Sequence, residues 1–556
     1  MRAESTGRVV LENPLLNRDS AFTGAERDRL GLRGMLPWRV GSLDQQVELE
    51  LEHIRRKSDD LEKYIGLAAL QDRNETLFYR VLMDHLEELA PIVYTPTVGQ
   101  ACSQFSHIMR RPRGIWITPD DVGRIPELLR CGARAEVQLI VATDNERILG
   151  LGDQGAGGMA IPVGKLALYT AGAGVHPAAT LPVSLDCGTD NEALLNDPKY
   201  LGYPHRRLRG PEYDAFIEAF VAAVLETHPK AILQWEDFKQ QTAMRLLDRY
   251  RSRLPSFNDD IQGTASVVFG GILSALRLKR ETLQDQRFVF MGAGAAGIGI
   301  ARLIEREMLA AGVDAGAVGR SIVMLDSHGL ISAVRSDLSE EKHHFAMSVE
   351  MARHFRLDPD RPCDLETVVH QVHPTVLIGT CAVPGTFTAT VVREMSQAVA
   401  VPVILALSNP TAKCEAVPAD VMLWSEGCAI MATGSPFDPV TVAGRERVIG
   451  QANNVYVFPG VGMGAIISGA QIITDEMFAV AAKTLAERVS WVRLESGALY
   501  PPLSDLRSVS HDIALAVAHE AVASGVAEAR SDGELEAKLE TTLWVPEYGR
   551  SDSKWG

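Results

Sequence analysis

Apolar residues recur every three or four positions through much of the first ninety residues, which is the spacing of one helix face. The spacing is followed by Leu43, Val47, Leu51 and Ile54. It resumes from Leu61 to Leu89, whereas residues 1–40 contain prolines and glycines that leave room only for short helices. We therefore predict an extended arm followed by a helical N-terminal domain.

Beyond residue 136, short apolar runs alternate with glycine-rich turns and helical segments. The runs that we read as strands are 137–143, 181–185, 231–233, 287–291, 321–325, 376–379 and 403–407. Strands that alternate with helices indicate a parallel sheet, so the fold class is α/β. The paired Asn453-Asn454 is read as preceding a further strand, and 506–539 is read as helical. From Glu540 on the chain is polar, and we expect it to be frayed or docked on a neighbouring subunit.

One glycine-rich turn lies in the context of a dinucleotide-binding site. The run 287–291 leads into Gly292-Ala293-Gly294-Ala295-Ala296-Gly297, and an apolar helix over Ile298–Leu309 follows. Glycines in this strand–turn–helix context let backbone amides approach a pyrophosphate at the helix N-terminus. Asp326, at the end of the next strand, stands where an acid would bind the adenosine ribose.

Two pairs of acids could supply metal ligands. Glu236-Asp237 follows the run 231–233, and Asp259-Asp260 opens an apolar helix over Thr264–Leu278. Carboxylates that converge repel one another unless a cation joins them, and oxygen ligands suit Mg²⁺ or Mn²⁺. The alternative is a turn at a strand end and an ordinary helix N-cap.

Isolated polar residues add further candidates, each of which also has an ordinary explanation. Tyr94 lies between two prolines in a segment, 91–99, that we read as a rigid loop, and it could simply pack. Arg147 and Lys165 lie at strand or helix ends, where such sheets bind ligands, although most such side chains are only solvated.

Composition and charge narrow the class of protein. The 556 residues are 46% hydrophobic and 23% charged, which is globular, and the net charge of −16 argues against a nucleic-acid partner. The seven cysteines are scattered without a C-x-x-C pair, which indicates a reducing compartment. We find neither a signal peptide nor an apolar run of roughly 20 residues, so we expect a cytoplasmic protein without a membrane partner.

Seven motifs taken together resemble those of the malic enzyme family, and in the family's order. They are Tyr94-Thr95-Pro96-Thr97-Val98-Gly99, Arg147-Ile148-Leu149-Gly150-Leu151-Gly152-Asp153, Gly164-Lys165, Trp235-Glu236-Asp237-Phe238, Phe257-Asn258-Asp259-Asp260-Ile261-Gln262-Gly263-Thr264, Ser408-Asn409-Pro410-Thr411 and Asn453-Asn454-Val455-Tyr456-Val457-Phe458-Pro459-Gly460. The resemblance covers nearly the whole chain, from about Asn13 to past residue 500.

The resemblance implies a division of the chain and an assembly. A helical N-terminal domain with its arm would occupy 1–112. An α/β substrate and metal domain over 113–258 and 454–525 would be interrupted by a Rossmann NAD(P)-binding domain over 259–453. A C-terminal tail would occupy 526–556. Malic enzymes are typically tetramers built as pairs of dimers, so we expect a homotetramer or a homodimer.

The resemblance also implies an activity and the residues that perform it. L-malate would be oxidised and decarboxylated to pyruvate and CO₂, and oxaloacetate would also be decarboxylated. Glu236, Asp237 and Asp260 would hold Mn²⁺ or Mg²⁺. Lys165 would be the general base, with Asp259 orienting its ammonium group, and Tyr94 would donate a proton to C3. The substrate would be bound by Arg147, Asn409 and Asn454.

The choice between NAD and NADP depends on the segment after the second Rossmann strand. The residues expected to contact the cofactor are Gly292, Gly294, Ala295, Ala296, Gly297, Asp326, Ser327, His328, Lys342 and Asn409. Asp326 alone favours NAD, because an acid repels a 2′-phosphate. In the family, a lysine at the position that we align with Lys342 accompanies NADP use, so we favour NADP. The alternative for Lys342 is a solvated helix face.

The sequence also bears on regulation and on rival functions. Arg73 matches part of the fumarate site of some animal relatives, but no second arginine is found, so we do not predict fumarate activation. A malolactic enzyme, which would release lactate with NAD and Mn²⁺, shares the active-site motifs. A non-catalytic dinucleotide or malate sensor is disfavoured, because degenerate enzymes usually lose groups such as Tyr94 and Lys165.

Overall fold

The computed structural model describes residues 6–549. In it the chain forms two compact units. The first unit comprises the chain up to Phe238 and again from Glu536, and the second comprises Lys239–Leu535. The helical N-terminal region, the parallel sheets and the Rossmann-like second unit confirm the predicted α/β class. The predicted four-part division of the chain stays a prediction.

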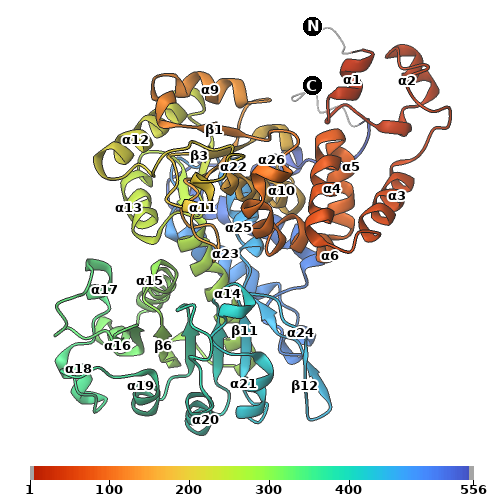
Figure 1. The fold of residues 1–556 in the computed structure, drawn as a ribbon. Helices are drawn as coiled ribbons and strands as arrows, with labels where there is room; N and C mark the ends of the chain where they lie inside the picture. Colours follow the sequence, from red (N-terminus) through yellow and green to blue (C-terminus); the bar gives the residue numbers. More distant parts are fainter. Residues whose placement is uncertain (1–5, 550–556) are drawn as a thin grey trace. The chain divides into compact units, whose positions relative to one another are not determined.

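The first unit begins with helices, as the apolar spacing predicted. They are α1 (Arg8–Glu12), α2 (Gly24–Arg29), α3 (Leu43–Arg55), α4 (Asp60–Arg73), α5 (Glu75–Asp84), α6 (Leu86–Val93), α7 (Thr97–Ser103) and α8 (Phe105–Ile108). Helices α3 to α7 pack against one another, and the short α1 and α2 occupy the arm (Figure 1). Buried Leu51, Leu61 and Leu82 lie on the faces that the spacing predicted to be apolar.

A parallel sheet follows in the same unit. Its elements in chain order are β1 (Ile115–Ile117), α9 (Ile125–Gly132), β2 (Leu139–Thr143), α10 (Ala160–Ala173), β3 (Thr180–Leu185), α11 (Glu192–Leu195), α12 (Gly210–Thr227) and β4 (Ile232–Trp235). The strands lie in the order β1-β3-β2-β4, with Leu139 of β2 opposite Thr180 of β3 and Ile232 of β4. Parallel strands end at one sheet edge, so the segments after β2 and β4 are neighbours.

The second unit opens with α13 (Gln240–Tyr250), β5 (Ser256–Asn258), the π-helical turn η5 (Asp259–Gly263) and α14 (Thr264–Lys279). A Rossmann-like sheet follows, in the order β14-β11-β10-β9-β6-β7-β8. Its strands are β6 (Phe288–Met291), β7 (Ile322–Asp326), β8 (Gly329–Leu330), β9 (Val376–Gly379), β10 (Val403–Ala406), β11 (Ile430–Thr433) and β14 (Gly450–Gln451). Only β8 pairs antiparallel within this sheet, and a small hairpin is formed by β12 (Val440–Val442) and β13 (Arg445–Arg447).

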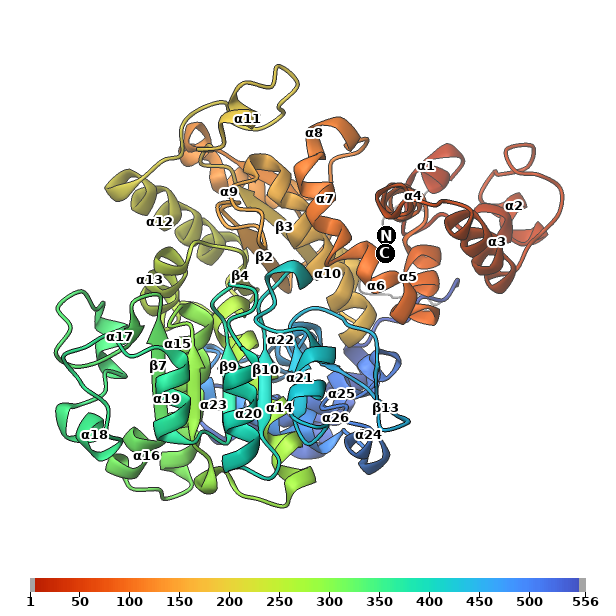
Figure 2. The ribbon, with the colours of Figure 1, turned by 60° about the horizontal axis from the view of Figure 1, so that its bottom comes forward.

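Helices cover this second sheet. They include α15 (Ala295–Ala310), α16 (Ala315–Ser321), α17 (Glu340–His344), α18 (Val349–His354), α19 (Leu365–Val372), α20 (Ala389–Ala398) and α21 (Pro418–Trp424). Figure 2 shows α19 and α20 in front of the strands. The core there joins Val368 and Val391 of these helices to Leu377 and Ile404 of the strands.

The remaining helices of the second unit form an apolar layer. They are α22 (Phe458–Ser468), α23 (Asp475–Glu487), α24 (Trp491–Glu495) and α25 (Leu506–Ala523), and α22, α23 and α25 pack together. Among the described residues, one helix, Asp259–Lys279, is long and apolar enough to span a membrane by composition, but 78% of its most apolar 18-residue stretch is buried within the protein.

Two expectations about local structure are wrong. Asn453 is the N-cap of the helical turn η8 (Asn454–Tyr456), which Asn454 begins, and α22 follows instead of a strand. A short apolar run does not distinguish a strand from a buried helix by periodicity. The last helix, α26 (Asp532–Thr542), leads into a tail that is packed and not frayed, since the Trp544 ring lies edge-on to the Tyr79 ring with 5.4 Å between the ring centres. Docking on a neighbouring subunit stays a prediction. Residues 550–556, also part of the predicted tail, lie outside the described range.

Candidate active site

Tyr94 ends α6 and lies just before α7. The predicted rigid loop is shorter than expected, because Pro91 lies inside α6 and α7 begins at Thr97. The Tyr94 side chain is buried, and its hydroxyl donates a hydrogen bond of 3.3 Å to Glu236 Oε1. Tyr94 is therefore directed toward a carboxylate rather than simply packed.

Lys165 projects from α10 toward the same carboxylate. Its side chain is only 3% exposed, and its Nζ lies 2.9 Å from Glu236 Oε1 and 5.5 Å from the centre of the Tyr94 ring. Gly164 permits this approach, because a Cβ there would lie 2.9 Å from Tyr94 Cδ2 and 3.0 Å from the Val93 carbonyl oxygen. The two predicted proton-transfer residues thus meet at one oxygen of Glu236.

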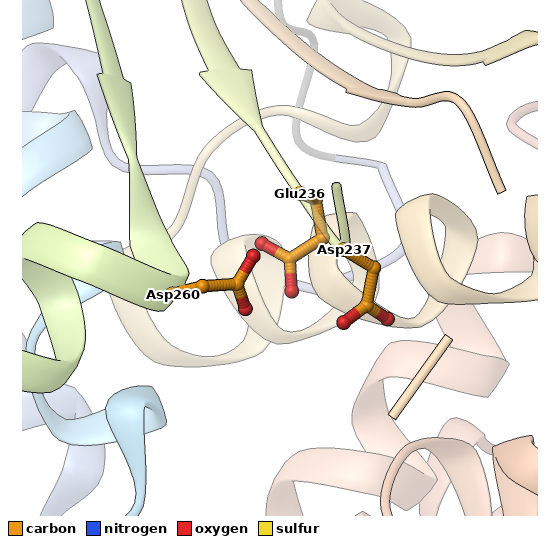
Figure 3. A group of neighbouring side chains, drawn as sticks. All are labelled: Glu236, Asp237 and Asp260. Atoms are coloured by element: carbon orange, nitrogen blue, oxygen red, sulfur yellow. The ribbon is translucent and has the colours of Figure 1, made fainter. Parts of the chain in front are cut away.

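Glu236 and Asp237 directly follow β4. Both are buried, and Asp237 adopts a left-handed backbone conformation with φ of 55°. This conformation turns the chain sharply at the sheet edge, and the Asp237 carbonyl oxygen accepts a hydrogen bond of 3.2 Å from the Arg147 amide. Figure 3 shows the Glu236 and Asp237 side chains extending from the end of this strand.

Arg147 lies on the loop after β2, at the same sheet edge. Its side chain is exposed, whereas the ends of its loop, Asp144 and Asp153, are held by Arg207. Burial opposes the charge on Arg207, but the neighbouring carboxylates of Asp144 and Asp153 raise its pKa above its usual range. We did not identify Arg207 from the sequence, because a residue in the run Arg206-Arg207-Leu208-Arg209 is expected to be solvated.

Three of the predicted residues belong to one cluster in the second unit. Asp259 is fully buried in η5, and Asp260 beside it is half-buried. Figure 3 shows the Asp260 side chain extending from this helical segment. Asn454 Nδ2 donates a hydrogen bond of 3.1 Å to Asp259 Oδ2 and another of 3.1 Å to Thr264 Oγ1. A Cβ at Gly263 would collide with Asp259 Oδ1, so glycine is required for this close packing.

Asn409 lies on the loop after β10. Its side chain is exposed, and its Oδ1 accepts a hydrogen bond from the Ser435 hydroxyl. This contact orients the amide so that its NH₂ group is directed away from Ser435.

The predicted dinucleotide turn has the geometry that the motif requires. Gly292 has φ of 121°, and a Cβ there would lie 2.6 Å from Thr380 Oγ1. A Cβ at Gly297 would lie 2.2 Å from the Gly292 carbonyl oxygen, so these glycines let the turn close against the helix. Gly294 precedes the first turn of α15, which contains Ala295 and Ala296. Backbone amides at this N-terminus are suited to a pyrophosphate.

Asp326 ends β7 and is bound to two cations. Lys342 Nζ lies 2.7 Å from Asp326 Oδ2, and Arg335 donates hydrogen bonds of 2.9 and 3.1 Å to its two oxygens. Burial opposes ionisation, but the hydrogen bonds from Arg335 and Lys342 hold the pKa of Asp326 well below its usual range. Ser327 and His328 are exposed beyond it. Arg335 is a further residue that we did not identify from the sequence.

The candidate metal ligands among the described residues are carboxylates. They are Glu236, Asp237 and Asp260. Their oxygens are hard donors, which fit Mn²⁺ or Mg²⁺ and do not suit a soft, thiolate-seeking ion.

Two family models match the chain. "Malic enzyme, N-terminal domain" matches residues 71–251, and "Malic enzyme, NAD binding domain" matches residues 261–522. Curated relatives include an "NAD-dependent malic enzyme" of Sodalis glossinidius, 46% identical, and an "NAD-dependent malic enzyme 2" of Photobacterium profundum, 47% identical. Each alignment covers 98% of this chain and 96% of the relative.

Solved structures share the fold. A malic enzyme of Entamoeba histolytica has a TM-score of 0.57 at 24% identity, covering 93% of this chain and 91% of that one. A malic enzyme of Pyrococcus horikoshii Ot3 has a TM-score of 0.56 at 23% identity, covering 82% of this chain and 89% of that one. At these identities the structures support the fold alone.

Proposed function

Because the chain belongs to the malic enzyme family, as the resemblance in its motifs predicted, we propose that it converts L-malate to pyruvate and CO₂ and reduces a nicotinamide cofactor. The observation that carries the proposal is the meeting of Lys165 and Tyr94 at Glu236 Oε1, at 2.9 and 3.3 Å. A base, Lys165, and an acid, Tyr94, beside one carboxylate that could bind a metal are suited to an oxidation that is followed by decarboxylation.

Lys165 acts as the base at the C2 hydroxyl of malate. Its ammonium must give up a proton before it can accept one, and the adjacent Glu236 lies within hydrogen-bond reach of it. Asp259, in the second unit, orients the lysine in this proposal. Asn454 supports that role, because its Nδ2 donates one hydrogen bond to the Asp259 carboxylate and another to the Asp259 backbone carbonyl oxygen.

Tyr94 donates the proton that completes the reaction. Loss of CO₂ leaves a three-carbon enol, which must be protonated at C3 to become pyruvate. A tyrosine is suited to this step, because a phenol with the ordinary pKa of about 10 can act as a general acid at neutral pH. Arg147 binds a malate carboxylate, for which a guanidinium is suited, and Asn409 and Asn454 contribute amide contacts.

Glu236, Asp237 and Asp260 would hold the metal. When bound, Mn²⁺ or Mg²⁺ polarises the C2 oxygen of the substrate and favours negative charge on it. The protein's share is to supply three carboxylates and to bury two of them, Glu236 and Asp237, away from competing water.

NAD is the cofactor that we propose. The relatives named above are NAD-dependent, and the preference for NADP drawn from Lys342 is not supported. The contacts of Lys342 offer a physical reason for a preference for NAD. Its ammonium group forms an ion pair with Asp326, and this pairing competes with binding of a 2′-phosphate. The Asp326 carboxylate remains the group suited to a ribose hydroxyl. When bound, NAD supplies the acceptor for the hydride from C2.

Assembly and location complete the proposal. We keep the homotetramer or homodimer and the cytoplasmic location as predictions, which sedimentation and cell fractionation would test.

Purified protein mixed with L-malate, Mn²⁺ and either NAD or NADP tests the activity. We expect reduced NAD to accumulate in step with pyruvate, and more slowly with NADP. Lactate without accumulating reduced cofactor would overturn the proposal in favour of a malolactic enzyme.

A further inference from the structure

A glutamine amide lies inside the buried strand β4, two residues before Glu236. Gln234 is fully buried between apolar neighbours, Leu233 and Trp235. Glu236 directly follows β4, and its amide donates a hydrogen bond of 2.9 Å to the Ala142 carbonyl oxygen of β2. Residues two apart in an extended chain share a face, so Gln234 and Glu236 point the same way. Its Nε2 donates a hydrogen bond of 2.8 Å to Glu236 Oε2.

Tyr169 fixes the other end of this amide. Tyr169 lies one turn beyond Lys165 on α10, is fully buried, and donates a hydrogen bond from its hydroxyl to Gln234 Oε1. An amide offers a donor at one end and an acceptor at the other, whereas a carboxylate only accepts. A reversed amide would place Oε1 against Glu236, so the amide has one stable orientation.

The two oxygens of Glu236 are thereby assigned different partners. Oε1 faces Lys165 and Tyr94, and Oε2 is held by Gln234. The terminal torsion of a glutamate is broad, so an unanchored carboxylate would turn freely. The hydrogen bond from Gln234 Nε2 to Glu236 Oε2 prevents the carboxylate from presenting both oxygens to Lys165.

We propose that Gln234 and Tyr169 are positioning residues that orient the Glu236 carboxylate for metal binding and for its contacts with Lys165 and Tyr94. The inference rests on the proposed function, in which Glu236 is a metal ligand. The Tyr169 hydroxyl satisfies only the oxygen of the buried amide, whose NH₂ group needs an acceptor of its own, and apolar residues would avoid the cost of burying both groups. The hydrogen bonds instead run from Tyr169 through Gln234 to Glu236, which is the candidate metal ligand.

The test compares Gln234→Met, Tyr169→Phe and the double variant with the full-length protein. Methionine keeps the volume of glutamine but cannot donate, and phenylalanine removes only the hydroxyl. Partners of metal ligands typically contribute 10–100-fold to metal affinity. We expect Gln234→Met to raise the Kd for Mn²⁺ alone, followed by the EPR signal of free Mn²⁺, by about tenfold.

Catalysis and folding give separate readouts. We expect kcat for malate to fall with Gln234→Met while the KM for NAD and the unfolding temperature stay near the wild-type values. Because Tyr169 acts through Gln234, the double variant should match Gln234→Met alone. Tyr79→Phe is the matched control, since Tyr79 is a buried tyrosine of the same unit that accepts a hydrogen bond from Gln71.

The outcomes separate the inference from the proposed function. Wild-type Mn²⁺ affinity and kcat in folded Gln234→Met would overturn the role of Gln234. If the effects of the two single substitutions on Mn²⁺ affinity and kcat multiply in the double variant, Tyr169 does not act through Gln234. Weakened Mn²⁺ binding in Gln234→Met, together with a wild-type protein that forms no pyruvate from malate, would support the inference and overturn the proposed function.

Discussion

The guanidinium of Arg207 donates two hydrogen bonds to the carboxylate of Asp153, one of 3.0 Å from Nε and one of 2.8 Å from Nη2. Its third nitrogen donates a bond of 2.7 Å to the Asp144 carbonyl oxygen. One fully buried side chain therefore joins both ends of the loop that carries Arg147. The loop's shape depends on a residue that lies outside it.

Replacing this guanidinium by an ammonium is expected to loosen the Arg147 loop. Arg207→Lys keeps the charge but cannot form the planar, two-bond contact with Asp153. We expect the KM for malate to rise about tenfold, with the KM for NAD unchanged, since a small displacement of a substrate-binding group is costly. Arg130→Lys, at an exposed pair with Glu226, is the control. Equal changes in both KM values would indicate a general loss of structure instead.

Lys165 is expected to be required for oxidation but not for metal binding. Lys165→Ala removes the proposed base, and general-base catalysis typically contributes about 10²–10⁴-fold. We expect malate turnover to fall within that range while Mn²⁺ still binds, as measured by EPR. Unchanged turnover would remove Lys165 from the role of base.

Tyr94 is expected to act after CO₂ has left. Tyr94→Phe keeps the ring but removes the hydroxyl that donates to Glu236. We expect pyruvate formation to be blocked, with the variant also failing to decarboxylate oxaloacetate at the native rate. Oxaloacetate decarboxylation at the wild-type rate would show that another group supplies the proton.

Local sequence predicted the parts of the site that depend on local backbone. Gly292 and Gly297 lie between a strand and a helix, and the close contacts at both positions follow from that context. Glu236 and Asp237 could be placed at a strand end, because the apolar run before them ends there.

Long-range pairing explains what sequence reasoning missed. Gln234 lies in an apolar strand, where pattern alone assigns it to packing, and its role depends on Tyr169, 65 residues earlier. Arg207 has no local signal, because its burial depends on Asp144, 63 residues away. Lys342 was recognised, but its pairing with Asp326 was not, and that pairing changes how its charge is interpreted.

His176 is expected to make the first unit less stable in mild acid. Burial lowers its pKa from 6.5 to about 4, an effect that Glu75 only partly offsets, and its Nδ1 accepts a hydrogen bond from the Ala178 amide. Between pH 6.5 and 4, His176 is therefore protonated in the unfolded chain and neutral in the folded chain. The free energy of unfolding consequently falls as the pH decreases through this window. Between pH 7 and 5 we expect a loss of about 2 kcal/mol.

Urea unfolding at the two pH values tests this expectation. His176→Gln, which does not titrate, should lose less stability between pH 7 and 5 than the wild type. His354→Gln, at an exposed histidine, should behave as the wild type does. Equal losses in the wild type and His176→Gln would assign the pH dependence to other groups.

Cofactor preference is expected to depend on Asp326 rather than on Lys342. Asp326→Ser removes the carboxylate suited to a ribose hydroxyl and releases Lys342 and Arg335, which both now pair with it. Two released cations suit a 2′-phosphate, so we expect kcat/KM to fall about tenfold or more for NAD and to rise for NADP. Lys342→Ala should leave the ratio of the two kcat/KM values near that of the wild type. Lys483→Ala, at an exposed lysine that pairs with Glu307, is the control. Selective weakening of NADP by Lys342→Ala would instead show that this lysine contacts the 2′-phosphate despite its pairing with Asp326.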